Sequence, residues 1–291
     1  TTVEVPVDQP LYVVANIRPV LETATRLAAN PSFRVGLRIE KYRGDGTEFD
    51  TLDEFRQGDD HRAIDWKASS RHGKLICRRN RAEREQSVCL AIDTGRLMGE
   101  PVDGVPRLDH AVQASLLLAY VCLSSGDRVG LMTFSGLVES WLAPRGGMGR
   151  IHELTRAASS LAYSEYEANH PLALTELARG LRRRSLVVLF TEFLDSATSG
   201  PMVERLGRLA HRHLVVFIVL RDEGLDRLAT ARPSDAHKLH RAVLADSLAM
   251  ERQVTLRELG RLGVLCIDAP PRTVGPRLVE RYLELKRRER I

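Results

Sequence analysis

The sequence predicts an α/β fold, in which helices cover both faces of a mainly parallel sheet. Short, continuous apolar runs recur from about residue 87 onward, which is typical of strands that are buried on both faces. Helical patterns alternate with these runs, as they do in parallel sheets. The chain has 291 residues, of which 43% are hydrophobic. This is enough for one large core and a smaller lobe.

Five apolar runs are the predicted parallel strands. They are Val88–Asp93, Arg128–Phe134, Leu186–Phe190, Leu214–Leu220 and Val264–Asp268. A sixth run, Leu137–Leu142, follows Phe134 after only two residues, Ser135 and Gly136. We therefore expect a hairpin here, with an antiparallel strand at or near the edge of the sheet.

Helices are predicted between these strands. The stretch Leu108–Leu123 is apolar nearly all round, which predicts a helix that is buried against the sheet. The remaining predicted helices are amphipathic and comprise Gly149–Leu161, Leu172–Arg183, Met202–Arg212, Ala236–Leu262 and Gly275–Arg288. The polar stretches Ser164–Pro171 and Arg221–Asp235 contain proline or glycine and are predicted loops.

The first 86 residues differ from the rest, because they contain few long apolar runs and many Gly, Asp and Arg residues. A helix is predicted over Arg18–Ala29, and Val35–Tyr42 alternates apolar and polar residues as a half-exposed strand does. Leu75–Arg79 is a candidate to pair with that strand. We interpret residues 1–86 as a small β-rich lobe and residues 87–291 as the α/β domain. Whether the lobe is a separate domain or a flap on the sheet stays open.

Composition restricts the functional classes. The 43 basic residues exceed the 38 acidic ones only slightly, and 5% aromatic residues offer little for base stacking, so nucleic-acid binding is not predicted. The longest apolar run, Leu214–Leu220, is far shorter than the roughly 20 residues of a membrane-spanning helix. The chain begins Thr1-Thr2 without Met. We therefore expect a cytoplasmic protein, or the cytoplasmic part of a protein that an upstream segment anchors in a membrane.

The segment from Phe55 to Leu75 has the densest chemistry of the chain. Asp59 or Asp60 can cap a helix that begins near His61, Gly73 can end it, and Trp66 would anchor it in apolar surface. As a catalytic site, the segment would use Asp59, Asp60, His61 and Asp65, and as a metal site it would use the oxygen atoms of the three aspartates. The favoured interpretation is a structural latch of Asp–Arg hydrogen bonds, because the neighbouring cations can neutralise those carboxylates; they are Arg56, Arg62, Lys67 and Arg71.

This segment resembles the signature of a bacterial family, the domain of unknown function fifty-eight. The residues that carry the resemblance are Leu52, Phe55, Arg56, Gly58, Asp59, Asp60, Arg62, Ile64, Asp65, Trp66, Lys67, Ser69 and Arg71, followed by Arg78, Glu83, Glu85 and the C-terminal stretch Arg281–Arg288. The resemblance covers the chain from about residue 50 to its end. It implies a von Willebrand factor A-like, Rossmann-like fold that is often attached to upstream membrane helices. It also implies a MoxR-type AAA+ ATPase as a partner, because the genes of the two are often neighbours.

The first predicted strand ends where von Willebrand factor A domains bind Mg²⁺ through an Asp-x-Ser-x-Ser loop. Here the loop reads Asp93, Thr94, Gly95, Arg96 and Leu97. Asp93 matches, but Gly95 has no side chain and Leu97 is apolar where the resemblance calls for hydroxyl groups. Because Mg²⁺ requires near-octahedral oxygen coordination, these losses predict a degenerate site without a metal or other cofactor.

The later loops of the predicted ion site have changed as well. The stretch 168–171, which contains His170, has no hydroxyl where the resemblance requires a threonine, and Glu192, after Thr191, replaces an aspartate. We expect Arg96 to bridge Asp93 and Glu192 in place of the ion. The loops still follow the carboxyl ends of parallel strands, where α/β folds present their binding surfaces. We therefore expect a partner-binding edge here.

These observations favour a non-enzymatic interaction or adaptor module that works with a MoxR-type AAA+ ATPase and a protein client in the assembly or maturation of complexes. One alternative is a metal-dependent ligand-binding domain. Another is a hydrolase that uses the Asp59 and Asp65 cluster. The hydrolase is disfavoured because the sequence contains no phosphate-binding loop, no HExxH pair and no GxSxG elbow.

Overall fold

The computed structural model describes residues 43–55, 64–81, 85–193 and 196–288, together with Glu22 and His61. The chain divides into two compact units, a small one of residues Arg38–Glu85 and a large one that contains Gln86–Ile291. Helices long and apolar enough to cross a membrane are absent from the described ranges.

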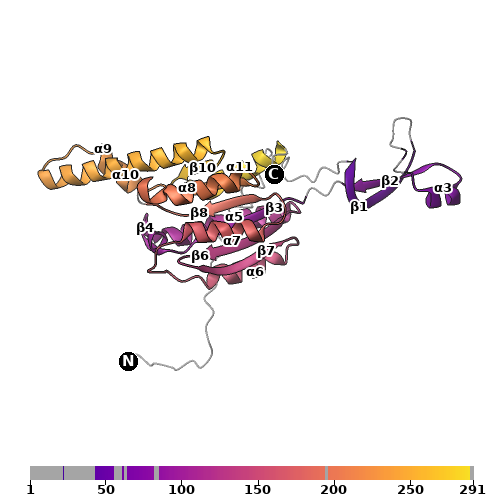
Figure 1. Ribbon diagram of the computed structural model, residues 1–291, viewed down its shortest axis with the longest axis horizontal. Coiled ribbons are helices and arrows are strands. Elements are labelled where there is room, and N and C mark those ends of the chain that lie inside the picture. Colours follow the sequence, from indigo (N-terminus) through magenta and orange to yellow (C-terminus); the bar gives the residue numbers. More distant parts are fainter. Residues whose placement is uncertain are drawn as a thin grey trace, which may run out of the picture. The chain divides into compact units, whose positions relative to one another are not determined.

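A six-stranded sheet forms the centre of the large unit, with the order β10-β9-β8-β3-β6-β7 (Figure 1). The strands are β3 (Ser87–Asp93), β6 (Arg128–Phe134), β7 (Val138–Arg145), β8 (Leu186–Phe190), β9 (Leu214–Leu220) and β10 (Leu265–Ala269). All neighbours are parallel except β7, which pairs with β6 as an antiparallel edge strand. The predicted strands and hairpin are confirmed; β10 is displaced by one residue, and β7 extends three residues further than expected.

Helices cover both faces of this sheet, so the predicted fold class is confirmed. One face carries α5 (Arg107–Ser124), α6 (Arg150–Ser159) and α11 (Pro271–Arg287). The other carries α7 (His170–Gly180), α8 (Ser196–Ala210) and α10 (Ala236–Arg261). Shorter elements complete the unit, namely α4 (Arg96–Gly99), β4 (Pro101–Val102), β5 (Val105–Pro106) and α9 (Glu223–Thr230).

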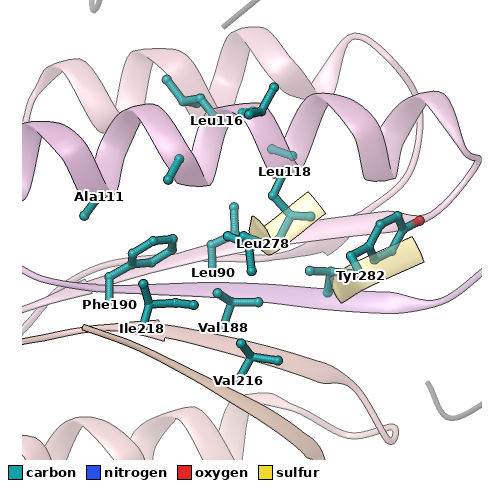
Figure 2. Close-up of a cluster of buried hydrophobic side chains, with 14 of the residues drawn as sticks. Leu90, Ala111, Leu116, Leu118, Val188, Phe190, Val216, Ile218, Leu278 and Tyr282 are labelled. Atoms are coloured by element: carbon teal, nitrogen blue, oxygen red, sulfur yellow. The ribbon is translucent and has the colours of Figure 1, made fainter. Parts of the chain in front are cut away.

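The apolar runs of the strands supply two separate cores, because successive side chains of a strand point to opposite faces. Leu90 packs in the cluster beneath α5 and α11, whereas Cys89 packs in the cluster beneath α7 and α8. Figure 2 shows the first cluster, with Leu90 and Val188 of the sheet near Leu118 of α5 and Leu278 of α11. A strand buried on both faces therefore needs the continuous apolar sequence that identified it.

Several helix boundaries differ from prediction. The stretch Arg221–Asp235, expected to be a loop, contains α9, because the side chain of Asp222 caps a helix there. The helix α7 begins at His170 rather than Leu172, with Asn169 as its cap. The helix α8 begins at Ser196, six residues before the expected start, and continues through Pro201. Proline is disfavoured in helix interiors, so the sequence predicted a start after Pro201.

Within its described residues, the small unit contains a two-stranded antiparallel sheet and one short helix. Its strands are β1 (Arg43–Glu54) and β2 (Ile76–Arg81), and the helix is α3 (Trp66–His72). β2 pairs with β1 in a register that sets Glu54 opposite Ile76, and the expected pairing of β2 with Val35–Tyr42 stays a prediction. The predicted strand 35–42 itself lies outside the described residues, as does the predicted helix 18–29 apart from Glu22, which is helical.

Candidate functional site at the switch point of the sheet

The sheet order creates a topological switch point at the centre of the large unit. From β3 the chain proceeds to β6 on one side, and after β7 it returns to β8 on the other side of β3. The loops after β3 and β8 therefore leave the sheet in opposite directions, which opens a crevice at the carboxyl ends of these strands. Asp93 ends β3, and Thr191 and Glu192 follow β8 directly.

Asp93 is buried and lies at the centre of this site, with 2% of its surface exposed. Its Oδ1 accepts the backbone N–H of Gly95 at 2.6 Å, and its Oδ2 accepts the hydroxyl of Thr191 at 2.5 Å. The Nε2 atom of His170 lies 2.8 Å from Thr191 Oγ1 and 3.4 Å from Asp93 Oδ2. Three residues predicted for the partner-binding edge, Asp93, His170 and Thr191, thus form one hydrogen-bonded group.

Thr94 and Gly95 shape the loop that follows Asp93. The Thr94 side chain is buried and donates to the carbonyl oxygen of Phe134 at 3.0 Å, which ties the end of β3 to the end of β6. A Cβ atom at Gly95 would lie 2.9 Å from Asp93 Oδ1 and 3.0 Å from the backbone nitrogen of Ala168. The loop of residue 168 therefore occupies the space that a hydroxyl-bearing side chain at position 95 would need.

Glu192 is held between two guanidinium groups. Its Oε2 accepts from Arg107 Nε at 3.2 Å, and its Oε1 accepts from Arg252 Nη2 at 3.3 Å and from the backbone N–H of Phe193 at 3.2 Å. Burial raises the pKa of Glu192, while the two nearby arginines oppose this shift. We name this cluster of Glu192, Arg107 and Arg252 the arginine clamp.

The expected bridge from Arg96 to Asp93 and Glu192 is wrong. Arg96 opens α4 and turns toward solvent, where its Nη2 atom lies 3.4 Å from Glu167 Oε1 and half of its side chain is exposed. Its backbone N–H donates to the carbonyl oxygen of Tyr166 at 2.8 Å. The buried positions beside the two carboxylates belong to Thr191 and His170 for Asp93, and to the arginine clamp for Glu192.

Arg107 and Arg252 are the site residues that the sequence reasoning missed. They lie 85 and 60 residues from Glu192 in the sequence and reach it from α5 and α10. A signal was present for Arg252, because helical spacing places it on the same face as Thr255 and Leu259, both fully buried. The signal for Arg107 is that a charged residue opens a helix that is apolar nearly all round.

A pocket of about 140 Å³ adjoins the group and is lined in part by Asp93, Leu97, His170, Glu192 and Met202. The residues around it do not match the oxygen-rich, octahedral coordination that Mg²⁺ requires. Both Asp93 oxygens accept protein donors, Leu97 is apolar, and Gly95 has no room for a hydroxyl. Within the described ranges, no three His, Cys, Asp or Glu residues are grouped so as to hold a metal ion.

The described part of the signature segment builds the junction between α3 and β2. Asp65 Oδ1 caps α3 by accepting the N–H groups of Lys67 at 3.1 Å and Ala68 at 2.9 Å. The helix therefore begins at Trp66 rather than near His61, and it ends at Gly73 as predicted. Buried Ser69 accepts the N–H of Ile76 at 2.9 Å, which ties α3 to β2.

Other expectations for this segment are wrong or stay predictions. Trp66 does not anchor the helix in apolar surface, because 70% of the residue is exposed. Lys67 and Arg71 are also exposed. The remaining signature residues, Arg56, Gly58, Asp59, Asp60 and Arg62, lie outside the described residues, so the latch stays a prediction.

Among known proteins, this chain is similar in sequence to mycobacterial relatives. Uncharacterized protein Rv1480 of Mycobacterium tuberculosis (strain ATCC 25618 / H37Rv) is 26% identical over 183 residues, which cover 62% of this chain and 56% of the relative. The chain thus spans about half the length of the curated relative that it matches.

Solved structures with a similar course of the chain include two bacterial proteins. Conserved hypothetical protein BatB of Bacteroides thetaiotaomicron has a TM-score of 0.45 and 13% identity, over 70% of this chain and 99% of that one. A von Willebrand factor type A protein of Catenulispora acidiphila has a TM-score of 0.40 and 10% identity, over 71% of this chain and 43% of that one. The family described as "Protein of unknown function DUF58" matches residues 52–238. The chain belongs to this family.

Proposed function

We propose that this chain is a non-enzymatic protein-interaction module whose partners are a MoxR-type AAA+ ATPase and a protein client. The observation that carries the proposal is the internal pairing of the polar groups at the switch point. Asp93, Thr191 and Glu192 are buried, and their side chains bond to other groups of the same chain. A nucleophile or general base must reach a substrate, so these residues are better suited to supporting loops than to catalysis.

The surface offered to a partner consists of the exposed residues around this group. We name Arg96, Tyr163, Tyr166 and Glu167 the switch-point surface. Tyr166 is 76% exposed and Tyr163 is 56% exposed. Arginine and tyrosine are enriched among the residues that dominate binding energy at protein interfaces. The backbone hydrogen bond from Arg96 to Tyr166 joins the two loops, so the surface is ordered before a partner arrives.

The proposed binding does not depend on a metal or another cofactor. In metal-dependent recognition, a coordinated ion would link the partner to Asp93, but both Asp93 oxygens already accept hydrogen bonds from this chain. The family resemblance supports the choice of the ATPase. The proposal places the module in the cytoplasm, either alone or as the cytoplasmic part of a membrane-anchored protein.

Binding of the purified ATPase to variants of the full chain tests this proposal. We expect Arg96→Glu to weaken binding about tenfold through charge reversal, and Tyr166→Ala to weaken it about 30-fold through loss of an aromatic contact. The matched control is Arg183→Glu, at an exposed position just before the amino end of β8, which should bind like the wild type. Titration calorimetry in each nucleotide state measures these affinities.

Three outcomes would contradict the proposal. The first is an absence of binding in every nucleotide state. The second is equal weakening by Arg96→Glu and Arg183→Glu, which would indicate a general effect of charge. The third is a loss of nucleotide-free binding when divalent cations are chelated, combined with tight binding of Mg²⁺ by the wild type and not by Asp93→Asn.

A further inference from the structure

The outer face of α10 is apolar and exposed. This helix has 26 residues, and its inner face is buried at Ala245, Thr255 and Leu259. The opposite face carries four apolar side chains that we name the α10 stripe: Leu239 (52% exposed), Val243 (58%), Met250 (60%) and Val254 (49%). Exposed apolar patches of this kind mark interaction surfaces, since a folded chain otherwise buries such side chains.

The members of the α10 stripe lie on one side of the helix. At 100° per residue, its four members fall within an arc of about 60°. Figure 1 shows α10 reaching past the edge of the sheet together with α9, which packs against it. The four exposed fractions are similar along the whole stripe, so the neighbouring α9 leaves it uncovered. A partner helix can therefore lie along the full stripe.

The spacing of the stripe is symmetric about its own centre. Leu239 and Val254 are equally far from the midpoint, as are Val243 and Met250, and the midpoint falls between Asp246 and Ser247. Two antiparallel copies of α10 would thus set Leu239 against Val254 and Val243 against Met250, twice each. A twofold interface requires this reciprocity, in which each patch is complementary to itself.

We propose that α10 pairs with α10 of a second copy of this chain as an antiparallel, twofold-symmetric dimer. The polar residues at the midpoint are compatible with a second copy of the chain, because Asp246 would face Ser247 of that copy and accept a hydrogen bond from its hydroxyl group. Asp246 and Ser247 are both exposed in the single chain. A polar pair in an apolar helix interface specifies the register at a cost in stability.

The ends of the two helices are complementary as well. The antiparallel arrangement places Arg257, near the carboxyl end of α10, beside the amino end of the other helix, where Asp235 is the cap. It also sets the positive end of each helix dipole beside the negative end of the other. Each copy contributes only four apolar side chains to the interface, and the charge of Asp246 lies at its midpoint. We therefore expect a weak dimer, with a Kd on the order of 10 μM.

Sedimentation equilibrium of the 291-residue chain tests the proposal. Val243→Glu places a charge in the interface and should weaken the dimer at least about 30-fold, whereas Asp246→Leu removes a charge from it and should tighten the dimer about tenfold. The matched control is Leu137→Glu, which alters another apolar residue that is 70% exposed. This control should dimerise like the wild type.

Cysteine cross-linking provides a readout of register. Ser247→Cys places a thiol beside the twofold axis and should yield a disulfide-linked dimer under mild oxidation. Ser160→Cys, at an exposed position after α6, should not. The wild type serves as background, because Cys77, Cys89 and Cys122 are buried and Cys266 is partly buried.

The opposite results would overturn the inference. A chain that stays monomeric up to about 100 μM has no such dimer. A dimer that Val243→Glu leaves intact uses another surface. If Val243→Glu lowers the thermal unfolding temperature of a monomer and does not change its association, the α10 stripe is covered by residues of the same chain.

Discussion

Three buried carboxylates in the large unit are each surrounded by hydrogen-bond donors, but the donors differ from one carboxylate to the next. A buried charge is tolerated when donors surround it, because the lost hydration must be replaced. Asp93 uses a backbone N–H and a hydroxyl, and Glu192 uses the arginine clamp. Asp127 is fully buried and accepts from Lys286 at 2.8 Å, from Tyr282, and from the backbone of Gln86. Burial raises its pKa, and Lys286 opposes that rise.

The Asp127 group gives a physical role to the C-terminal stretch that carries part of the family resemblance. Tyr282 and Lys286 come from α11, four residues apart, so they lie on one face of the helix. Both reach Asp127 at the start of β6, which fastens the last helix to the sheet. Two residues of this stretch therefore make a contact that completes the fold.

His213 should make the stability of the protein sensitive to mild acid. It is 4% exposed, and neither of its ring nitrogens has a hydrogen-bond partner within the described part of the chain. Burial lowers its pKa, and the charges of Arg212 and Arg184 lower it further. The folded state therefore binds this proton less readily than the unfolded state. The stabilising contribution is complete above about pH 6.5 and is lost as the pH falls through the lower pKa of the folded state.

We expect the free energy of unfolding to decrease from pH 7 to pH 5, and His213→Leu to remove part of that decrease. One proton limits the part to about 1.4 kcal/mol per pH unit. Urea unfolding across this range measures the difference. His211→Leu is the control, because His211 is exposed and should leave the slope unchanged. Equal slopes for His213→Leu and the wild type would show that His213 does not cause the sensitivity.

At the scale of elements, Arg252 joins α10 to the ends of β8 and β10. It contacts Glu192 after β8, and its Nη1 atom lies 3.8 Å from Asp268 in β10. Asp268 also pairs with Arg221, which follows β9, at 3.0 Å. A continuous row of alternating charges therefore runs from the arginine clamp to the base of α9. It holds the inner face of α10 to the carboxyl edge of the sheet.

Arg252→Met should destabilise the large unit by about 2 kcal/mol, because it leaves the buried Glu192 with one guanidinium instead of two. The control is Arg241→Met on the same helix. Arg241 is exposed, so its replacement should change the free energy of unfolding by no more than about 0.5 kcal/mol. Denaturant unfolding at low protein concentration separates this effect from association. A cost for Arg252→Met that equals the control would mean that the clamp contributes nothing to α10.

The buried strands were predictable, because a strand covered on both faces has a continuous apolar sequence. The predictions for β8 and β9 coincide with the observed bounds, Leu186–Phe190 and Leu214–Leu220. The helix α9 was missed because it has only eight residues and lies in a polar stretch that contains glycine and proline, which is typical of a loop. Capping residues determine where such helices begin. A capping residue can be recognised in the sequence only when the residues after it are known to be helical.

At the scale of the molecule, part of the site followed from topology. Asp93 and Glu192 were expected together because both follow parallel strands, whose carboxyl ends share one edge of the sheet. The partners of Glu192 could not be derived in this way, since Arg107 and Arg252 lie on helices whose rotation about the sheet depends on packing. Local sequence therefore predicted which carboxylates lie at this edge of the sheet, and the tertiary structure decided which groups neutralise or bind them.

The described hydrophobic clusters predict that residues 86–291 fold without the preceding residues. Every described member of both hydrophobic clusters comes from Val88 or a later residue, so the described residues before Gln86 supply no side chain to either core. Gln86 itself should be retained, because its N–H donates to Asp127 Oδ1 at 3.1 Å and its carbonyl oxygen accepts the N–H of Arg128 at 2.8 Å. We therefore expect a fragment of residues 86–291 to unfold cooperatively, within a few degrees of the full chain.

Thermal unfolding followed by circular dichroism tests this expectation, with Leu118→Ala in the fragment as the reference. Leu118 is fully buried between α5 and the sheet, so its truncation should cost about 2–5 kcal/mol and lower the unfolding temperature clearly. Leu118→Ala should lower the unfolding temperature of the full chain by the same amount, since the fragment and the full chain would share one core. A fragment that unfolds without cooperativity, or in which Leu118→Ala has no effect, would mean that the cores need residues before Gln86, and the two units would then be one folding domain.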